Sequence, residues 1–390
     1  TIASIRFEGV EEARAARIAT TLDTAPGQAV DVRRIEEDLQ ELAALGDYER
    51  IDYRLVRNAD TGGENLVIGL RENNWGPNYL RLGIDLRTDF QGEGAFNLRL
   101  SHNRHWLNDS GAEWRNRVQV GETLGLYSEL YQPLGLASER FLSAYVDASV
   151  RRVDLYGLDG DALARLQRRS LRLGADIGWP IGLRGTVGEM RLGLVSSARR
   201  ATPELLSASL AGLPVASSVR WRENGLRAAV IADQLDFANF PSRGYRALGE
   251  FVEGNFTGVR SFGPHTLNMG ARFAHASRIP LGAIDEYSLG GFQNLSGYRT
   301  GQVAGNYLVF GRLTYYRRLP WDVGVARALF VGGSLEAGNA WLTRRDISLG
   351  DLRGAGSLFV GADTGIGPLY LSVVSAPKGF TGLYLFLGRP

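Results

Sequence analysis

From Asn78 to the C-terminus the chain repeatedly alternates apolar residues with polar or very small ones, over segments of about ten residues. In the first segment one face carries Leu80, Leu82, Ile84 and Leu86, and the other carries Arg81, Gly83, Asp85 and Arg87. A tilted strand of about ten residues crosses a bilayer. A soluble sandwich would bury the apolar face under a second sheet, and arginines would seldom fill its opposite face. The pattern therefore predicts a transmembrane β-barrel with lipid outside and water inside.

Composition supports strands over helices as the membrane-crossing elements. No apolar run approaches the roughly 18 residues that a spanning helix needs. The 390 residues carry a net charge of only +2, which argues against nucleic acid as a partner. Cysteine is absent and glycine reaches 50 residues, which suits a barrel that passes through an oxidising periplasm without disulfides. The absence of cysteine alone would also fit a cytosolic protein.

Sixteen strands are expected, an even number that leaves both chain ends on one side of the membrane. They are 78–88, 95–105, 113–121, 126–133, 140–153, 169–180, 188–199, 225–235, 244–255, 257–262, 265–277, 306–319, 328–341, 357–365, 369–375 and 381–389. Short connections (135–139, 263–264, 367–368) alternate with long ones (201–218, 278–305, 342–356). The short set should lie in the periplasm with the termini, and 201–218 is long enough for a surface helix. Strand 257–262 is too short to cross, so either the barrel is thin there or residues near 255–263 are missing.

Residues 1–74 have a different character from the barrel region, 75–390. The pattern predicts β-α-α-β-β order, with strands at Ile2–Phe7, Tyr48–Val56 and Glu64–Glu72, a helix at Glu11–Leu22, and a second helix between Asp31 as N-cap and Gly46. This order, together with the segment Leu45-Gly-Asp-Tyr-Glu-Arg-Ile51, resembles one POTRA domain. A generic α+β module is the alternative.

Three ordered motifs in the barrel resemble those of the outer-membrane protein 85 superfamily, which includes two-partner secretion transporters and barrel-assembly insertases. The first lies in the long connection 278–305 and is similar to the V/I-R-G-Y/F motif of an inward-folded sixth loop; its residues are Gly290, Gly291, Leu295, Ser296, Gly297, Tyr298 and Arg299. The second resembles a barrel-wall motif, with Glu336 in its acidic position and Gly338 after it. The third resembles an F-P-x-x-G-Y turn and comprises Phe240, Pro241, Gly244 and Tyr245.

The resemblance implies that a loop arginine is held by the barrel-wall carboxylate. This chain departs from the pattern, because Ser296 occupies the position of that arginine. Our hypothesis is that Arg299 reaches Glu336 instead. The alternative is that Glu336 only lines a hydrated lumen and Arg299 pairs elsewhere. Tyr298 is expected to pack against the barrel wall in either case.

The resemblance further implies a protein translocator in the outer membrane of a Gram-negative bacterium. The POTRA domain would lie in the periplasm and capture an unfolded polypeptide as an added strand. The polypeptide would pass through the lumen once the sixth loop moves, or use a weak seam between strands 78–88 and 381–389. The last strand, with Gly382, Leu385 and Leu387, resembles an assembly signal read by the barrel-assembly machinery, although it ends in Pro390 where an aromatic residue is usual. The implied partners are outer-membrane lipid, an unfolded client or the chain's own passenger, and that machinery.

A single POTRA-like domain favours the patatin-like autotransporters of the type V secretion class, in which a lipid-acyl hydrolase precedes the POTRA domain. The passenger would then be the chain's own N-terminal domain, outside this sequence, together with any export signal. An insertase, a diffusion porin and an outer-membrane lipase are the alternatives. We expect no catalysis by this chain and no cofactor or metal, because no G-x-S-x-G motif is present and the spacing of His102 and His105 places them on opposite faces of a strand.

Overall fold

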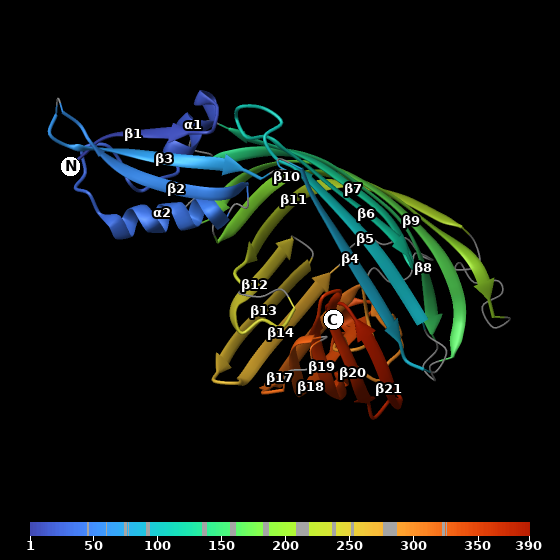
Figure 1. The fold of residues 1–390 in the computed structure, drawn as a ribbon. Helices are drawn as coiled ribbons and strands as arrows, with labels where there is room; N and C mark the ends of the chain where they lie inside the picture. Colours follow the sequence, from blue (N-terminus) through green and yellow to red (C-terminus); the bar gives the residue numbers. More distant parts are fainter. Residues whose placement is uncertain are drawn as a thin grey trace.

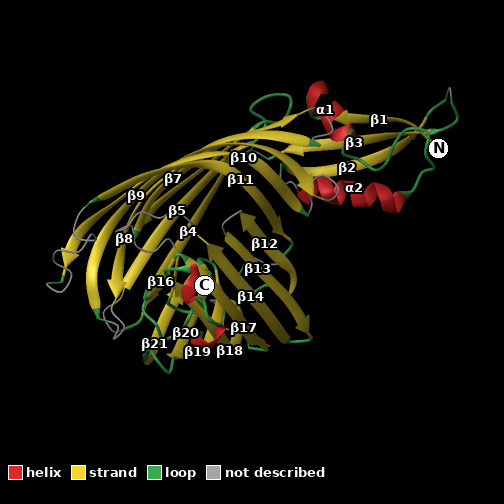
Figure 2. Ribbon diagram, turned by 180° about the vertical axis from the view of Figure 1, so that it is seen from behind, coloured by secondary structure: helices red, strands yellow, loops and turns green. Residues whose placement is uncertain are grey.

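The computed structural model describes the chain from Thr1 to Pro390 except residues 45–46, 60, 74–75, 77, 91–93, 135–138, 157–160, 182–186, 208–217, 236–238, 251–252, 276–286, 322–323 and 325. Within the described residues, no helix has the length and apolarity needed to cross a membrane. Figure 2 shows that strands dominate the fold and that the two α-helices belong to the N-terminal domain.

The N-terminal domain has the predicted β-α-α-β-β order. Its elements are β1 (Ile2–Glu8), α1 (Glu12–Ala19), α2 (Val32–Ala44), β2 (Tyr48–Arg57) and β3 (Glu64–Glu72). The sheet order is β1-β3-β2, with β1 parallel to β3 and β2 antiparallel to it. Asp31 caps α2, because its Oδ1 accepts hydrogen bonds from the backbone N–H groups of Arg33 and Arg34. The predicted helix stop, Gly46, lies outside the described residues.

The remaining strands form a closed antiparallel barrel of sixteen strands, as predicted (Figure 1). They are β4 (Asn78–Thr88), β5 (Gly94–Arg104), β6 (Glu113–Gly121), β7 (Thr123–Leu134), β8 (Arg140–Tyr156), β9 (Ala162–Ile181), β10 (Gly188–Leu206), β11 (Val219–Asp233), β12 (Arg243–Glu250), β13 (Glu253–Phe262), β14 (His265–His275), β17 (Tyr307–Leu319), β18 (Ala326–Trp341), β19 (Arg353–Thr364), β20 (Gly367–Ser375) and β21 (Thr381–Leu387). A two-stranded hairpin, β15 (Tyr287–Leu289) and β16 (Val303–Gly305), and two 3-10 turns, Arg344–Asp346 and Leu349–Asp351, complete the fold.

Several predicted boundaries are wrong. β9 begins at Ala162 and not at 169, and β11 begins at Val219 and not at 225. The strand expected at 244–255 is two strands, because β12 ends at Glu250 and β13 begins at Glu253, so β13 has ten residues and is not short. The loop expected from Ala201 begins later, since β10 continues to Leu206. On β10, Thr202, Pro203 and Glu204 interrupt the apolar alternation although the pairing with β9 continues to Leu206. Between β12 and β13, residues 250–253 include no glycine, proline or asparagine that would mark a turn.

The carboxylate of Asp47 joins the N-terminal domain to β4 and to the turn between β5 and β6. Asp47 Oδ1 lies 2.7 Å from Nδ1 of His105 and accepts a 2.8 Å hydrogen bond from the hydroxyl of Tyr79, while Oδ2 accepts one of 3.2 Å from the indole of Trp106. The guanidinium of Arg14 lies 4.6 Å from the Trp106 ring centre, which adds a cation–π contact. These contacts hold the N-terminal domain against the end of the barrel at which β4 begins and β5 ends (Figure 1).

This contact should weaken above neutral pH. Burial lowers the pKa of His105, but the hydrogen bond to Asp47 and the charges of Glu113 and Asp47 outweigh it, so the pKa is raised above 6.5. Burial raises the pKa of Asp47, but the hydrogen bonds from His105, Tyr79 and Trp106 hold it below 3.8. The stabilisation from His105 is full below pH 6.5 and is lost as the pH rises through its raised pKa. The stabilisation from Asp47 is full above pH 3.8 and is lost as the pH falls through its lowered pKa.

Hydrogen–deuterium exchange of residues 105–112, corrected for intrinsic rates, should therefore be slower at pH 5.5 than at pH 8.5. In His105→Gln the corrected rates at the two pH values should be equal. An unchanged pH dependence in that variant would contradict the assignment.

Candidate functional site: a loop sealed against the barrel wall

The hairpin formed by β15 and β16 carries the glycine-rich segment between them into the barrel interior. Leu289, Leu295, Tyr298 and Val303 of this segment are at most 4% exposed and share one apolar cluster with Leu308 and Phe310 of the wall strand β17. Within the segment, the backbone N–H of Gly290 donates to the carbonyl of Asn294 at 2.6 Å, and that of Gly291 to the carbonyl of Tyr298 at 2.9 Å. The segment, here called the sealing loop (residues 287–305), is folded on itself and packed on the wall.

The sealing loop is bound by the carboxylate of Glu336 on β18. Oε2 accepts hydrogen bonds from the backbone N–H groups of Leu295 (2.8 Å) and Ser296 (2.6 Å), and Oε1 accepts one from the hydroxyl of Ser296 (2.8 Å). The hydroxyl of Ser334, on the same strand, donates a further bond of 2.5 Å to Oε1. Glu336 is only 4% exposed and Ser296 is fully buried. A buried carboxylate with both oxygens satisfied forms strong, charge-assisted hydrogen bonds.

The predicted Arg299–Glu336 pair is wrong. The guanidinium carbon of Arg299 lies 5.9 Å from the ring centre of Tyr156 on β8, and its backbone N–H donates to Gln302. Ser296, the residue that departs from the family motif, is the one that binds Glu336. The nearby positive charge belongs to the wall: Arg312 lies directly across from Glu336 in the β17–β18 ladder and donates from Nη1 to the carbonyl of Gln293 at 3.1 Å.

The backbone of the sealing loop is strained where it meets Glu336. Gln293 and Leu295 have φ angles of 55° and 79°, a region of backbone conformation that residues other than glycine seldom adopt. Such a conformation costs about 1–3 kcal/mol per residue and persists only where neighbouring contacts hold it. Gly297 has φ 81°, and a Cβ there would lie 2.7 Å from the carbonyl oxygen of Phe380, whose backbone N–H donates to the Gly297 carbonyl at 2.7 Å. The loop is thus bound on one side by Glu336 and on the other by the turn between β20 and β21.

Tyr298 and Gly338 decide how closely the loop approaches the wall. Tyr298 is 1% exposed, and the guanidinium of Arg353 on β19 lies 5.6 Å from its ring centre. At Gly338 a Cβ would lie 2.9 Å from Phe310 and 3.0 Å from Leu289. The glycine after the acidic position therefore leaves the space that the loop residue Leu289 occupies.

The turn motif joins the same wall. Phe240 stacks on Phe330 with ring centres 4.0 Å apart, and the carbonyl of Pro241 accepts a hydrogen bond from the hydroxyl of Tyr316. An aromatic cluster joins these rings to Phe292 of the sealing loop; it comprises Phe240, Phe292, Tyr316, Phe330, Phe359, Tyr370, Val374 and Tyr384. Gly244 and Tyr245 lie at the start of β12, where Tyr245 is paired with Gly258 and faces outward. Only the first half of the motif therefore contacts the site.

The last strand, β21, packs against the sealing loop and also pairs with β4 where the barrel closes. The inward side chains of Tyr384 and Phe386 have ring centres 6.2 and 5.8 Å from that of Phe292. Gly382 pairs with Val374 inside the sheet. Only Leu385, Phe386 and Leu387 of β21 pair with β4, opposite Thr88, Arg87 and Leu86. The barrel closes along a seam much shorter than the eleven-residue strand β4.

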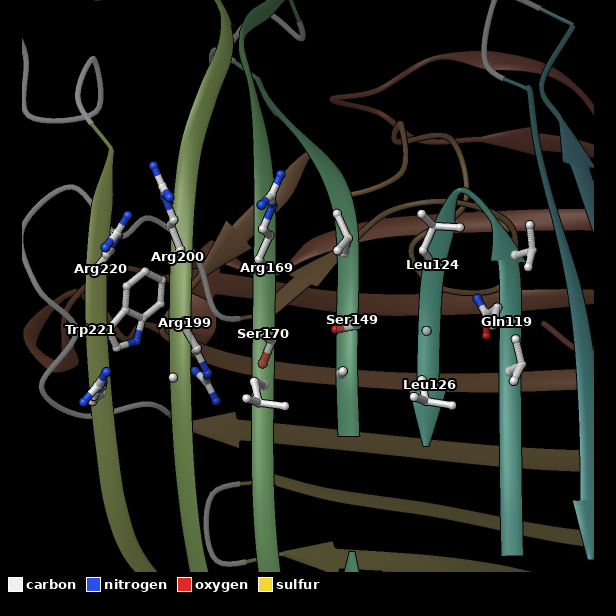
Figure 3. Close-up of a pocket in the computed structure, with 18 residues that line it drawn as sticks. Gln119, Leu124, Leu126, Ser149, Arg169, Ser170, Arg199, Arg200, Arg220 and Trp221 are labelled. Atoms are coloured by element: carbon white, nitrogen blue, oxygen red, sulfur yellow. The ribbon is translucent and has the colours of Figure 1, made fainter. Parts of the chain in front are cut away.

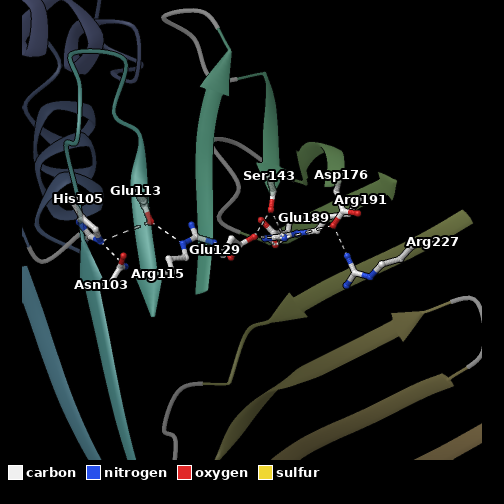
Figure 4. Close-up of polar contacts among 10 residues, drawn as sticks. All are labelled: Asn103, His105, Glu113, Arg115, Glu129, Ser143, Asp176, Glu189, Arg191 and Arg227. Atoms are coloured by element: carbon white, nitrogen blue, oxygen red, sulfur yellow. Dashed lines mark hydrogen bonds and ion pairs between the residues drawn. The ribbon is translucent and has the colours of Figure 1, made fainter. Parts of the chain in front are cut away.

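The opposite wall of the lumen carries a charged network that the sequence analysis did not single out (Figure 4). Arg191 on β10 contacts Glu129 on β7 and, at 2.6 Å, Glu189 on its own strand. Arg227 on β11 donates to Asp176 on β9 at 2.5 Å. The signal was present as charged residues at the inward positions of β7, β9, β10 and β11, but no local spacing shows that these strands bring them together.

The two histidines of the H-x-x-H spacing make separate polar contacts. His102 lies within hydrogen-bonding distance of Asn78 and Asn116, at 3.3 Å from each, while His105 contacts Asp47. Among the residues that the structure describes, no group of three histidine, aspartate or glutamate side chains is arranged to hold a metal ion.

Comparison with known proteins gives fold relatives at low identity. The chain matches a structure of BamA from Haemophilus ducreyi lacking POTRA domains 1–3 with a TM-score of 0.69 and 13% identity, over 99% of this chain and 83% of that one. It matches CdiB from Acinetobacter baumannii with a TM-score of 0.61 and 12% identity, over 99% and 73%. No protein-family model and no curated protein matches the sequence. The chain therefore has the sixteen-stranded barrel fold found in BamA and CdiB.

Removing the carboxylate should release the sealing loop, whereas removing Arg299 should not. Ser296→Ala deletes one hydrogen bond to a charged acceptor, which is worth about 1.5–3 kcal/mol, and Glu336→Ala deletes all three loop bonds to that carboxylate. In proteoliposomes we expect protease protection of residues 290–301 to fall in the order wild type, Ser296→Ala, Glu336→Ala. Arg299→Ala should match wild type, and a loss of protection as large as that of Glu336→Ala would contradict this geometry.

A methyl group at position 338 should disturb the packing of the sealing loop against the wall. Gly338→Ala forces Leu289 and Phe310 apart, and such overpacking costs about 1–3 kcal/mol. Gly311→Ala is the matched control, because a Cβ there meets nothing within 4 Å. Thermal unfolding followed by circular dichroism should show a clear drop in Tm for Gly338→Ala only; equal Tm values for the two variants would refute the role of Gly338.

Proposed function

We propose that the chain is an outer-membrane protein translocator whose lumen is sealed by the loop that Glu336 holds. The observation that carries the proposal is this seal: the buried carboxylate binds three donors of the loop, and the loop backbone is strained in that position. A diffusion porin has no need for a strained segment bound deep in its lumen. A seal held by a few strong bonds can open when a competing polypeptide displaces it.

In this proposal the N-terminal domain is a single POTRA domain that receives the polypeptide. Its sheet order leaves β1 and β2 as edge strands, and an extended chain can add to such an edge through main-chain hydrogen bonds with little demand on sequence. Asp47 holds the domain at the barrel mouth, so a captured segment is delivered next to the lumen.

The lumen favours passage along the wall opposite the sealing loop. The Arg191 and Arg227 network presents both signs of charge there, whereas the wall under the loop is mostly aromatic or small, and its Glu336 and Arg312 are engaged by the loop. A hydrated wall with mixed charges can solvate backbone amides without binding one sequence tightly. The short β4–β21 seam is a second route, and it is the one an insertase would use.

The finer proposal is that the passenger is the chain's own N-terminal domain, a patatin-like lipid-acyl hydrolase. It rests on the family resemblance of the loop motif and on the single N-terminal domain. The chain itself carries no catalytic role in this proposal.

Translocation can be tested by fusing an unfolded reporter segment ahead of Thr1 and reconstituting the fusion in lipid vesicles. We expect the reporter to become protease-accessible on the side opposite the N-terminal domain, and accessibility should fall several-fold when the sealing loop is tethered. The tether is a Ser296→Cys and Ser334→Cys pair, because both hydroxyls contact Oε1 of Glu336 on the lumen side of the wall. It is screened for disulfide formation, and reduction should restore export. Export that is unaffected by a formed tether would contradict a loop-gated lumen.

A seam lock separates translocation from insertion. Leu86→Cys with Leu387→Cys joins cross-strand partners at the seam, and Leu82→Cys with Leu100→Cys joins partners inside the wall as the control. A lumen translocator should export its reporter equally with either disulfide. If the seam disulfide alone abolishes export, or if the chain accelerates folding of unrelated barrels into vesicles and the seam disulfide stops it, the insertase alternative is favoured.

A further inference from the structure

A row of arginines crosses the outer face of three neighbouring strands at the barrel end away from the N-terminal domain. Arg200 on β10 pairs directly with Arg169 on β9 and with Arg220 on β11. Arg222 lies two residues further along β11, opposite Ala198. Figure 3 shows Arg169, Arg200 and Arg220 side by side on consecutive strands. Like charges placed directly opposite one another destabilise a sheet, so a bare row of this kind opposes the pairing of its own strands.

The row faces outward. Because side chains alternate along a strand, Arg200 lies on the same face of β10 as Met190, Leu192 and Leu194, which are 45–65% exposed. The opposite face carries Arg191 and Ser197, each 5% exposed. The ten residue steps from Met190 to Arg200 span about 33 Å of strand, or about 25 Å of height at the usual barrel tilt. That height equals a typical apolar band, so the row lies at the band's far edge, where lipid headgroups begin.

Carboxylates on this face do not neutralise the row. Glu204 accepts a hydrogen bond from Arg152 at 3.0 Å, and Asp154 accepts one from Arg165 at 2.6 Å. Arg169 and Arg200 donate only to neutral oxygens, those of Gln167 at 2.8 Å and Ser218 at 3.0 Å. Among the described residues, no carboxylate lies within ion-pair distance of Arg169, Arg200, Arg220 or Arg222. The connection 208–217 contains neither aspartate nor glutamate, so it has no carboxylate to offer.

Apolar side chains adjoin the row. An open pocket of about 580 Å³ has the four arginines at one end. Its other outward side chains are Val118, Val120, Leu124, Leu126, Ala148, Val150, Leu171 and Ala198, from β6 to β10. A surface with a cationic edge and an apolar floor matches a molecule with phosphate at one end and acyl chains at the other.

We propose that this pocket binds an anionic, phosphate-bearing lipid in the leaflet away from the N-terminal domain. The phosphates would bridge Arg169, Arg200, Arg220 and Arg222, and the acyl chains would lie along the apolar side chains of β6–β9. Guanidinium groups bind phosphate in forked, charge-assisted pairs, so one lipid with two phosphates can neutralise most of the row. The inference rests on the proposed membrane placement but not on translocation.

The test compares wild type with the triple variant Arg169→Gln, Arg200→Gln, Arg220→Gln in neutral detergent micelles. A matched control, Arg33→Gln, Arg50→Gln, Arg57→Gln, removes the same charge from the N-terminal domain. Bis-phosphorylated lipid A, its dephosphorylated form and inorganic phosphate are each added at equal concentration. Retained lipid is measured by native mass spectrometry and Tm by circular dichroism.

We expect lipid A to raise the Tm of wild type and of the control, with binding to the triple variant at least tenfold weaker. Without lipid, the triple variant should unfold at the same or a higher temperature, because the cross-strand repulsion is gone, and this shows that it is folded. Binding of lipid A to the triple variant within twofold of wild type would overturn the proposal. So would equal binding of the dephosphorylated lipid, or an equal Tm rise with inorganic phosphate. None of these outcomes depends on export, so they leave the proposed translocation untouched.

Discussion

The buried carboxylate of Glu336 is the interaction on which the closed lumen depends. An ionised group removed from water is costly unless its oxygens are hydrogen-bonded. Here the wall supplies one donor, Ser334, and the sealing loop supplies the other three. If the loop leaves, water must replace those three donors. Loop position and hydration of the lumen wall are therefore coupled through a single side chain.

The donors that this chain uses are neutral, and this affects how the loop can open. In the family pattern an arginine would meet the acidic position, and opening would separate two buried charges. In this chain Ser296 and two backbone N–H groups bind the carboxylate, while the nearest cation, Arg312, stays on the wall. Opening therefore separates no ion pair between loop and wall. The strain at Gln293 and Leu295 acts in the same direction, because it is relieved when the loop detaches.

The lumen has two different walls, because the inward-facing residues are mostly aromatic or small on one side and charged on the other. From β17 to β21 they are largely aromatic or small and hold the sealing loop. From β7 to β11 they carry the charges that pair as Glu129 with Arg191 and Asp176 with Arg227. On the outer face of β9–β11 the same alternation places leucines in the apolar band and arginines beyond it. One period of two residues thus produces the seal, the polar wall and the basic row.

The sequence by itself determined the barrel, its sixteen strands and the order of the N-terminal elements, because alternation with period two, turn residues and helix caps are local signals. It misplaced several strand ends, for example at β10, where Thr202, Pro203 and Glu204 interrupt the alternation, and at 250–253, which hold no typical turn residue. It identified Glu336 and the loop motif but chose Arg299 as the partner, since charge complementarity favoured it. Only the tertiary structure showed that Ser296 is the residue whose side chain binds Glu336. Which donor reaches a carboxylate forty residues away depends on how a strained loop packs against strands from the whole barrel, and no local pattern encodes that distance.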